Sequence, residues 1–252
     1  MEVLDRYRNK NILLICAESF SWPMHNIAKE LRGVTNKLNA FYIQPGEAYF
    51  EGPEYKTFKN LNSDIRIHEM SAIVAQYLDR HKNAKEYIDW EYIKKIERDY
   101  SKYASLNQQL ISEMTLSSYY HDRDYYDSID YNKILLYVQL YYQYVEKLFE
   151  DNTFDVILDL DVDFFGRAVL LEVSAFNDVP YVSIDESRLD DYCLPSISGK
   201  RNRNIHIEQS YNNFAKDKTI NNDPDVIKLY QRSKEIIGDV PDMYKKIYSQ
   251  KN

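Results

Sequence analysis

Apolar and polar residues follow one another over residues 154–188 in an order that predicts a strand, a helix and a second strand. The segment begins with the apolar run Val156–Leu158, and it ends with a second apolar run, Tyr181–Ile184. Between them, the apolar residues from Ala168 to Ala175 recur at helical spacing, and Asn177-Asp178 closes the helix. Two apolar runs joined through a helix are typical of a parallel βαβ unit with a right-handed crossover.

The first part of the chain has the same organisation. Ile12–Ala17 is apolar throughout, which predicts a strand in the middle of a sheet, and a polar turn over 18–22 follows it. Pro23 is suited to the first turn of a helix, whose buried face is predicted to consist of Met24, Ile27, Ala28, Leu31 and Val34. Two further strands are predicted at Ala40–Ile43 and around Ile65 and Ile67, with a loop over 44–59 between them.

Helical periodicity dominates residues 71–150. Helices are predicted at Ser71–His81, Trp90–Met114 and Asp130–Glu150, and their apolar faces are too extensive for a solvated linker. We expect them to cover the sheet or to form a helical insertion beside it. The predicted fold is therefore an α/β, Rossmann-like parallel sheet flanked by helices, with a helical insertion. We expect one domain over residues 1–215, followed by a helical extension or a truncated linker over 216–252.

The composition limits the class of protein. Among 252 residues, 32 Lys and Arg stand against 40 Asp and Glu, and the resulting net charge of −8 argues against a nucleic-acid partner. Cys16 and Cys193 are the only cysteines, so a disulfide framework is not expected and a reducing compartment fits. No apolar run approaches the length of a membrane span, and the N-terminal residues lack an apolar signal core. We therefore expect a cytoplasmic protein, and we leave peripheral contact with the inner face of the membrane open.

Scarce glycine and abundant tyrosine narrow the candidate chemistry. With 6 glycines and neither a GxGxxG nor a P-loop pattern, the sequence offers no glycine-rich phosphate loop. The 5 histidines have no paired spacing, and no metal site is predicted from them. The 24 tyrosines are interpreted first as bulky, half-buried packing residues, and only second as stacking platforms for sugars or bases.

Ligands of open parallel sheets bind at the carboxyl ends of the strands, so candidate residues are sought in the turns that follow the strands. After the first strand, Glu18 is the predicted general base, and His25, one helical turn into the helix, is the alternative base. Arg167 begins the helix after the strand at 156–158. It is expected either to hold an anionic group or to pair with Asp161 or Asp163. The substrate-binding residues predicted in these turns are Ser19, Asp161, Asp163, Arg167, Ser187 and Arg188.

One longer stretch resembles a known family. The sequence GRAVLLEVSAFNDVPYVSIDESRLDDY after FDVILDLD is similar to the first-domain segment of bacterial capsule and surface-polysaccharide biosynthesis proteins with a GT-B-type glycosyltransferase architecture. The matching elements are Gly166-Arg167, Val179-Pro180 and Ser187-Arg188. The stretch LSSYYHDRDYY resembles the family's "dR" element, which adds Arg123 to the predicted substrate-binding residues. The resemblance spans roughly residues 11–215.

The resemblance implies the acceptor-side half of a glycosyltransferase. In this architecture two Rossmann-like domains face each other across a cleft, and the second domain holds the nucleotide-sugar donor. That second domain is expected to be missing from this chain. The resemblance therefore implies a glycan or glycolipid acceptor as ligand, a separate donor domain as partner, and no cofactor held by this chain alone. Arg167 or Arg188 would then orient acidic groups or phosphates of the acceptor.

Two alternatives remain open. The spacing Asp159-x-Asp161-x-Asp163 after an apolar strand also matches a Mg²⁺-dependent phosphatase, in which Asp159 is the nucleophile and carboxylate oxygens bind the cation. The other alternative is a non-catalytic module that binds a glycan or a protein.

Overall fold

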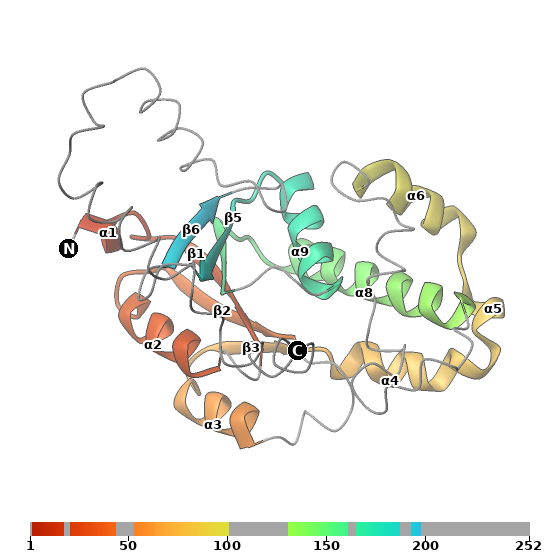
Figure 1. The fold of residues 1–252 in the computed structure, drawn as a ribbon, viewed down its shortest axis with the longest axis horizontal. Coiled ribbons are helices and arrows are strands. Elements are labelled where there is room, and N and C mark those ends of the chain that lie inside the picture. Colours follow the sequence, from red (N-terminus) through yellow and green to blue (C-terminus); the bar gives the residue numbers. More distant parts are fainter. Residues whose placement is uncertain are drawn as a thin grey trace, which may run out of the picture. The chain divides into compact units, whose positions relative to one another are not determined.

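The structure of the protein, a computed structural model, describes residues 2–17, 21–43, 53–100, 131–160, 165–186 and 193–197 (Figure 1). Met1–Ile184 and Pro195–Arg203 belong to one compact unit, and the architecture given below is that of this unit. The predicted domain boundary at residue 215 lies outside the described residues and stays a prediction.

Six strands form one sheet in the order β3-β2-β1-β4-β5-β6. The pairs from β3 to β5 are all parallel, and β1 pairs Ile12 with Leu38 of β2 on one side and with Val156 of β4 on the other. This confirms the predicted α/β, Rossmann-like fold, and it places the carboxyl ends of β1, β4 and β5 at one edge. The strands are β1 (Asn11–Cys16), β2 (Lys37–Tyr42), β3 (Arg66–Glu69), β4 (Val156–Asp159), β5 (Tyr181–Glu186) and β6 (Cys193–Ile197).

Helices cover both faces of the sheet because the central strands are apolar on both sides. Along β1, Leu13 and Ile15 share a core with the buried residues of α4, α5, α6, α8 and α9, whereas Ile12 and Leu14 pack with α2 and α3. The helices described within residues 71–100 and 131–151 therefore contribute to the core on this side of the sheet, and α4, α5 and α6 pack mainly on α8 and α9. The helices are α1 (Glu2–Asp5), α2 (Ser21–Leu31), α3 (Pro53–Leu61), α4 (Ser71–Arg80), the 3₁₀ helix η3 (His81–Asn83), α5 (Ala84–Tyr87), α6 (Trp90–Tyr100), α8 (Tyr131–Asp151) and α9 (Phe165–Phe176).

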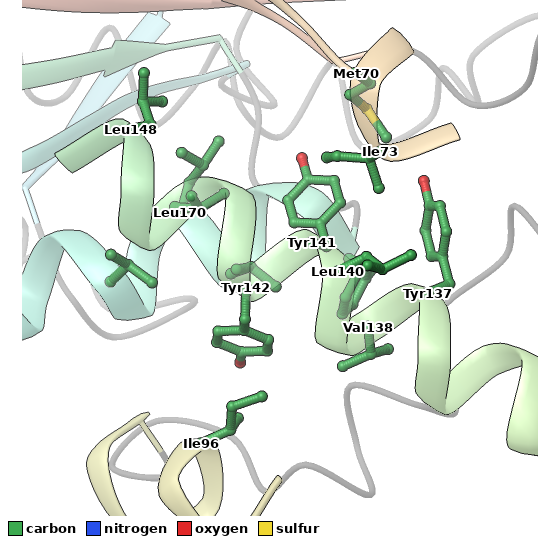
Figure 2. Close-up of a cluster of buried hydrophobic side chains, with 14 of the residues drawn as sticks. Met70, Ile73, Ile96, Tyr137, Val138, Leu140, Tyr141, Tyr142, Leu148 and Leu170 are labelled. Atoms are coloured by element: carbon green, nitrogen blue, oxygen red, sulfur yellow. The ribbon is translucent and has the colours of Figure 1, made fainter. Parts of the chain in front are cut away.

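Helix α8 is the centre of the larger core, and its tyrosines point in several directions. Figure 2 shows Tyr141 and Tyr142 leaving opposite sides of α8, with Tyr142 directed towards Ile96 of α6. Tyr141 also makes an edge contact with the ring of Phe165 in α9, with 5.3 Å between the ring centroids. Both tyrosines are buried, so in this core the abundant tyrosine serves packing.

A polar cluster around Glu146 attaches α6 to α8. Tyr92 Oη donates a hydrogen bond to Glu146 Oε2 at 2.6 Å, and Lys95 Nζ and Tyr100 Oη donate to Oε1. Burial raises the pKa of Glu146, but the hydrogen bonds from Lys95, Tyr100 and Tyr92 outweigh it, so that this pKa lies below its usual range. Glu146 is therefore ionised at neutral pH and holds three side chains of α6.

The structure differs from the predicted elements most clearly at α3 and β6. Residues 53–59, predicted as the end of a loop, belong to α3, in which Tyr55 and Phe58 are buried three positions apart. The Gly52-Pro53 pair resembles a loop signal, but Pro53 is the first residue of this helix, where proline is well tolerated. Strand β6 was not predicted, because it lies in a stretch that is polar overall. The helix predicted at Trp90–Met114 is described as far as Tyr100.

Replacing Gly166 by alanine is expected to destabilise the fold. An alanine Cβ would lie 2.3 Å from Tyr141 Oη and 2.8 Å from Tyr141 Cζ, and Tyr141 is fully buried. Overpacking of this kind costs about 1–3 kcal/mol, which exceeds the roughly 1 kcal/mol that alanine gains over glycine within a helix. The free energy of unfolding, measured by urea denaturation, should therefore fall in Gly166→Ala.

Tyr141→Leu provides the control background, because it removes the ring that the new methyl group would meet. In this background Gly166→Ala should lower the free energy of unfolding by clearly less than it does in the wild type. Equal costs in the two backgrounds would contradict the close approach of Tyr141 to α9.

Candidate functional site

The connections of the sheet reverse direction between β1 and β4. From β1 the chain passes through α2 to β2, on one side, while from β4 it passes through α9 to β5, on the other. Helix α2 packs on one face of the sheet and α9 on the opposite face. In open parallel sheets such a reversal leaves a crevice outside the carboxyl ends of the two strands, and ligands bind there. The candidate site is therefore the edge formed by the ends of β1 and β4.

A buried ion pair lies at the β4 side of this edge. Asp159 is the last residue of β4, and Arg167 lies in the first turn of α9. Arg167 Nε donates to Asp159 Oδ2 at 2.9 Å and to Oδ1 at 3.2 Å, and both side chains are 0% exposed. The backbone N–H of Leu160 donates to Oδ1 at 2.7 Å, and the hydroxyl of Tyr181 donates to Oδ2. The pair thus connects the end of β4, the start of α9 and strand β5.

Burial controls the electrostatics of this cluster. It raises the pKa of Asp159 to about 6, although Arg167 and the hydrogen bond from Tyr181 act in the opposite direction. Burial also raises the pKa of Cys16, at the end of β1, and the charge of Asp159 raises it further. A group that attacks phosphorus must reach the solvent-exposed substrate, and Asp159 has no exposed surface. The geometry therefore argues against Asp159 as the nucleophile of a phosphatase.

The structure also gives Arg167 its partner. The sequence left open whether Arg167 holds an anionic ligand or pairs with Asp161 or Asp163. Asp159 is an observed partner that was not predicted, whereas Asp161 and Asp163 lie outside the described residues. The other predicted residues of the strand ends and of the helical segment lie outside the described residues, so their roles stay predictions: Glu18, Ser19, Arg123, Asp161, Asp163, Ser187 and Arg188.

At the β1 side of the edge, the first turn of α2 is firmly attached to the sheet. Ser21 Oγ lies 3.0 Å from the carbonyl oxygen of Ala17, to which it donates, and 2.8 Å from Tyr42 Oη of β2. The contact with Tyr42 is buried, and Tyr42 is itself held by ring contacts with Tyr55 and Phe58 of α3. The first turns of α2, and the side chains on them, are therefore held firmly against the sheet.

Trp22 and His25 lie in these first turns of α2. Trp22 is 61% exposed, and the centroid of its indole lies 5.6 Å from that of the His25 imidazole. His25 is half-buried, and its Nδ1 atom lies 3.1 Å from Asn62 Oδ1, just beyond α3. Of these two residues, His25 was a predicted site residue and Trp22 was not. An aromatic residue in the first turn after the central strand was the signal that could have identified it.

The described residues give no indication of a metal site or of a membrane span. Within them, no three or more His, Cys, Asp or Glu side chains are grouped so that they could hold a metal ion. In the same part of the chain, no helix combines the length and the apolar character that crossing a bilayer requires.

Removing either member of the buried ion pair is expected to be costly. Asp159→Asn removes the carboxylate that Arg167 Nε contacts in the interior, and Arg167→Met removes the guanidinium from beside the buried carboxylate. Each change should lower the free energy of unfolding by about 3–5 kcal/mol. Combined in one protein, the two changes should lower the free energy of unfolding by much less than the sum of the single effects, because neither charge of the pair then remains. Additive costs in denaturant titrations would contradict the coupling.

The raised pKa of Asp159 gives a second expectation, for the pH dependence of stability. The folded state holds a proton on this carboxyl up to about pH 6, whereas the ordinary value is 3.8. Between these values the folded state binds more protons than the unfolded state, so the contribution of Asp159 to stability increases as the pH falls. Between neutral pH and a pH below about 4, this contribution of Asp159 to the free energy of unfolding increases by about 3 kcal/mol.

Asp159→Asn is the matched reference, with Asp159→Asn/Arg167→Met in its place if the single variant is too unstable to titrate. Relative to the reference, the wild type should gain stability between neutral pH and about pH 4. A difference that is constant with pH, or that shrinks on acidification, would rule out the raised pKa.

Comparison with known proteins identifies no family for this chain. It matches no known family model, and no curated protein is significantly similar to it. The resemblance to polysaccharide-biosynthesis proteins therefore depends on the residues quoted above, and the function has to be argued from the geometry of the site.

Proposed function

We propose that this chain is the acceptor-side half of a glycosyltransferase-like protein of surface-polysaccharide biosynthesis. Its glycan or glycolipid acceptor binds at the carboxyl edge of the sheet, where β1 leads into α2. The observation that carries this proposal is the pairing of an exposed indole with an imidazole, Trp22 with His25, in the first turns of the helix that follows β1.

The chemistry of this edge favours a neutral, hydroxylated ligand. A flat aromatic surface packs against the apolar face of a ring, and an imidazole nitrogen exchanges hydrogen bonds with hydroxyl groups. The positive charge of Arg167 would attract a phosphate, but in the interior it is neutralised by the carboxylate of Asp159. These features support binding of a sugar in preference to binding of a phosphate group by this part of the edge.

In the proposed reaction, an acceptor hydroxyl attacks the anomeric carbon of the donor sugar. The new bond forms between the acceptor oxygen and that carbon, while the bond from the carbon to the nucleotide phosphate breaks and the phosphate leaves with its electrons. The hydroxyl proton passes to a general base, for which His25 and Glu18 are the candidates. The nucleotide-sugar donor is expected to be held by a second domain, whereas this chain binds the acceptor and supplies the general base.

The two alternatives differ in how well the geometry supports them. A phosphatase that uses Asp159 and Mg²⁺ is not favoured, because Asp159 is buried in an ion pair. A non-catalytic module would bind a glycan through the same Trp22 and His25, and it differs from the transferase in lacking any proton transfer.

Binding should depend on Trp22. The fluorescently labelled chain is expected to be retained on an array of bacterial surface glycans, and Trp22→Ala should weaken that binding by roughly tenfold, because the stacking surface is lost. Trp90→Ala is the matched control: Trp90 is 54% exposed at the start of α6, a helix of the opposite face, and should not affect binding. No retained glycan, or an equal loss in both variants, would refute the proposal.

The phosphatase alternative has its own assay. The chain should release no phosphate from p-nitrophenyl phosphate in the presence of Mg²⁺, since Asp159 is closed off from solvent. Release that disappears in Asp159→Asn, in a variant that still folds, would restore that alternative.

A further inference from the structure

The orientation of the Asn62 side chain follows from two of its partners. Asn62 is 0% exposed, and its Nδ2 group donates to the carbonyl oxygen of Phe58 at 2.6 Å. Its Oδ1 atom accepts a hydrogen bond from Arg32 Nη2 at 2.8 Å. A carbonyl can only accept and a guanidinium can only donate, so the amide cannot be turned around without losing both bonds.

This orientation determines which nitrogen of His25 carries the proton. His25 Nδ1 lies 3.1 Å from Asn62 Oδ1, which is an acceptor, so Nδ1 must be the donor. In a neutral imidazole the other nitrogen, Nε2, then has a lone pair that can accept a proton or a hydrogen bond. Among the described residues, no group forms a hydrogen bond with Nε2.

The partners of Asn62 are themselves anchored. Arg32 forms two parallel hydrogen bonds with Asp64, from Nε to Oδ2 and from Nη2 to Oδ1, both at 2.9 Å. Its Nη2 group also reaches the carbonyl oxygen of Leu61 at 3.3 Å. This bidentate pair fixes the guanidinium and balances its charge, so the environment of Asn62 carries no uncompensated positive charge that would attract an anion.

We propose that Trp22 and Nε2 of His25 form a subsite for a sugar ring of the acceptor, with Asn62 as the residue that positions His25. The indole stacks on the apolar face of the ring, and Nε2 accepts a hydrogen bond from one of its hydroxyl groups. The assignment rests on the proposed function and deepens it. In this assignment His25 is the general base, and the fold already determines that Nε2 is its proton-accepting nitrogen. Asn62 then positions His25, in addition to its structural role after α3.

Nitrogen-15 NMR of the full chain tests the assignment and requires no activity assay. Two-bond correlations at a pH of about 8, above the usual titration range of histidine, show which nitrogen of each imidazole is protonated. His25 should carry its proton on Nδ1, and its signals are identified by their loss in His25→Gln. His81 is an internal reference for the same tautomer, because its Nδ1 lies 2.9 Å from the carbonyl oxygen of Leu78.

The second step adds a probe, a mixture of the methyl glycosides of glucose, galactose, mannose and N-acetylglucosamine. The Nε2 signal of His25 and the indole N–H signal of Trp22 should both shift on saturation, while the reference signals of His81 stay unchanged. In Asn62→Ala the imidazole loses its fixed donor position, so the Nε2-protonated form should become populated and the binding should weaken.

The outcomes separate the two claims. A proton on Nε2 of His25 in the wild type overturns the subsite, whatever the chain binds. Glycoside binding that leaves the signals of Trp22 and His25 unchanged overturns the subsite but not the proposed function. Absence of binding, both here and on the glycan array, overturns both, and the observed tautomer then decides only whether Asn62 positions His25.

Discussion

Burial of the central strands on both faces is the constraint on which the rest of the structure depends. Strands β1 and β4 have apolar side chains on either side, so each face requires a layer of helices, and polar side chains near these strands collect at their ends. The connections then leave the carboxyl edge in opposite directions, through α2 on one face and α9 on the other. The site is a consequence of that arrangement, and its two sides have different chemistry because they are built by different helices.

On the β4 side, charge is used to build the fold. Asp159 and Arg167 have no exposed surface, and the carboxylate also holds Tyr181 and the N–H of Leu160. A buried pair of this kind contributes little net stability compared with apolar residues of the same size, but it penalises any arrangement that separates the partners. On the β1 side, polar and aromatic groups remain accessible, since Ser21 anchors the first turn of α2 and leaves Trp22 exposed.

The main elements could be predicted from the sequence because their patterns are local. Unbroken apolar runs indicated β1, β4 and β5, and residues at helical spacing indicated α2, α8 and α9 close to their observed bounds. Helix α3 was missed because proline and glycine at its start resemble a loop, although Tyr55 and Phe58 have helical spacing.

The site was less predictable than the fold. That Arg167 would pair with a nearby acidic residue could be expected from proximity in sequence, but its contact with Asp159, at the end of the preceding strand, depends on how α9 packs on the sheet. The contact between His25 and Asn62 joins α2 to the end of α3 across 37 positions, and no local pattern predicts it. Interactions between elements decide which side chains are available for chemistry, and a single sequence does not contain that information in readable form.

The pairing of β1 with β4 has a consequence for how the protein forms during synthesis. Ile12 pairs with Val156, so the central strand of the sheet finds one of its neighbours only after more than half of the chain has left the ribosome. Until then, β1 can pair with β2, but its other edge has unsatisfied backbone groups and the face that α8 will cover is exposed. Long-range pairing of parallel strands is slow, and the nascent first half of the chain is the species in which association with other chains would compete with folding.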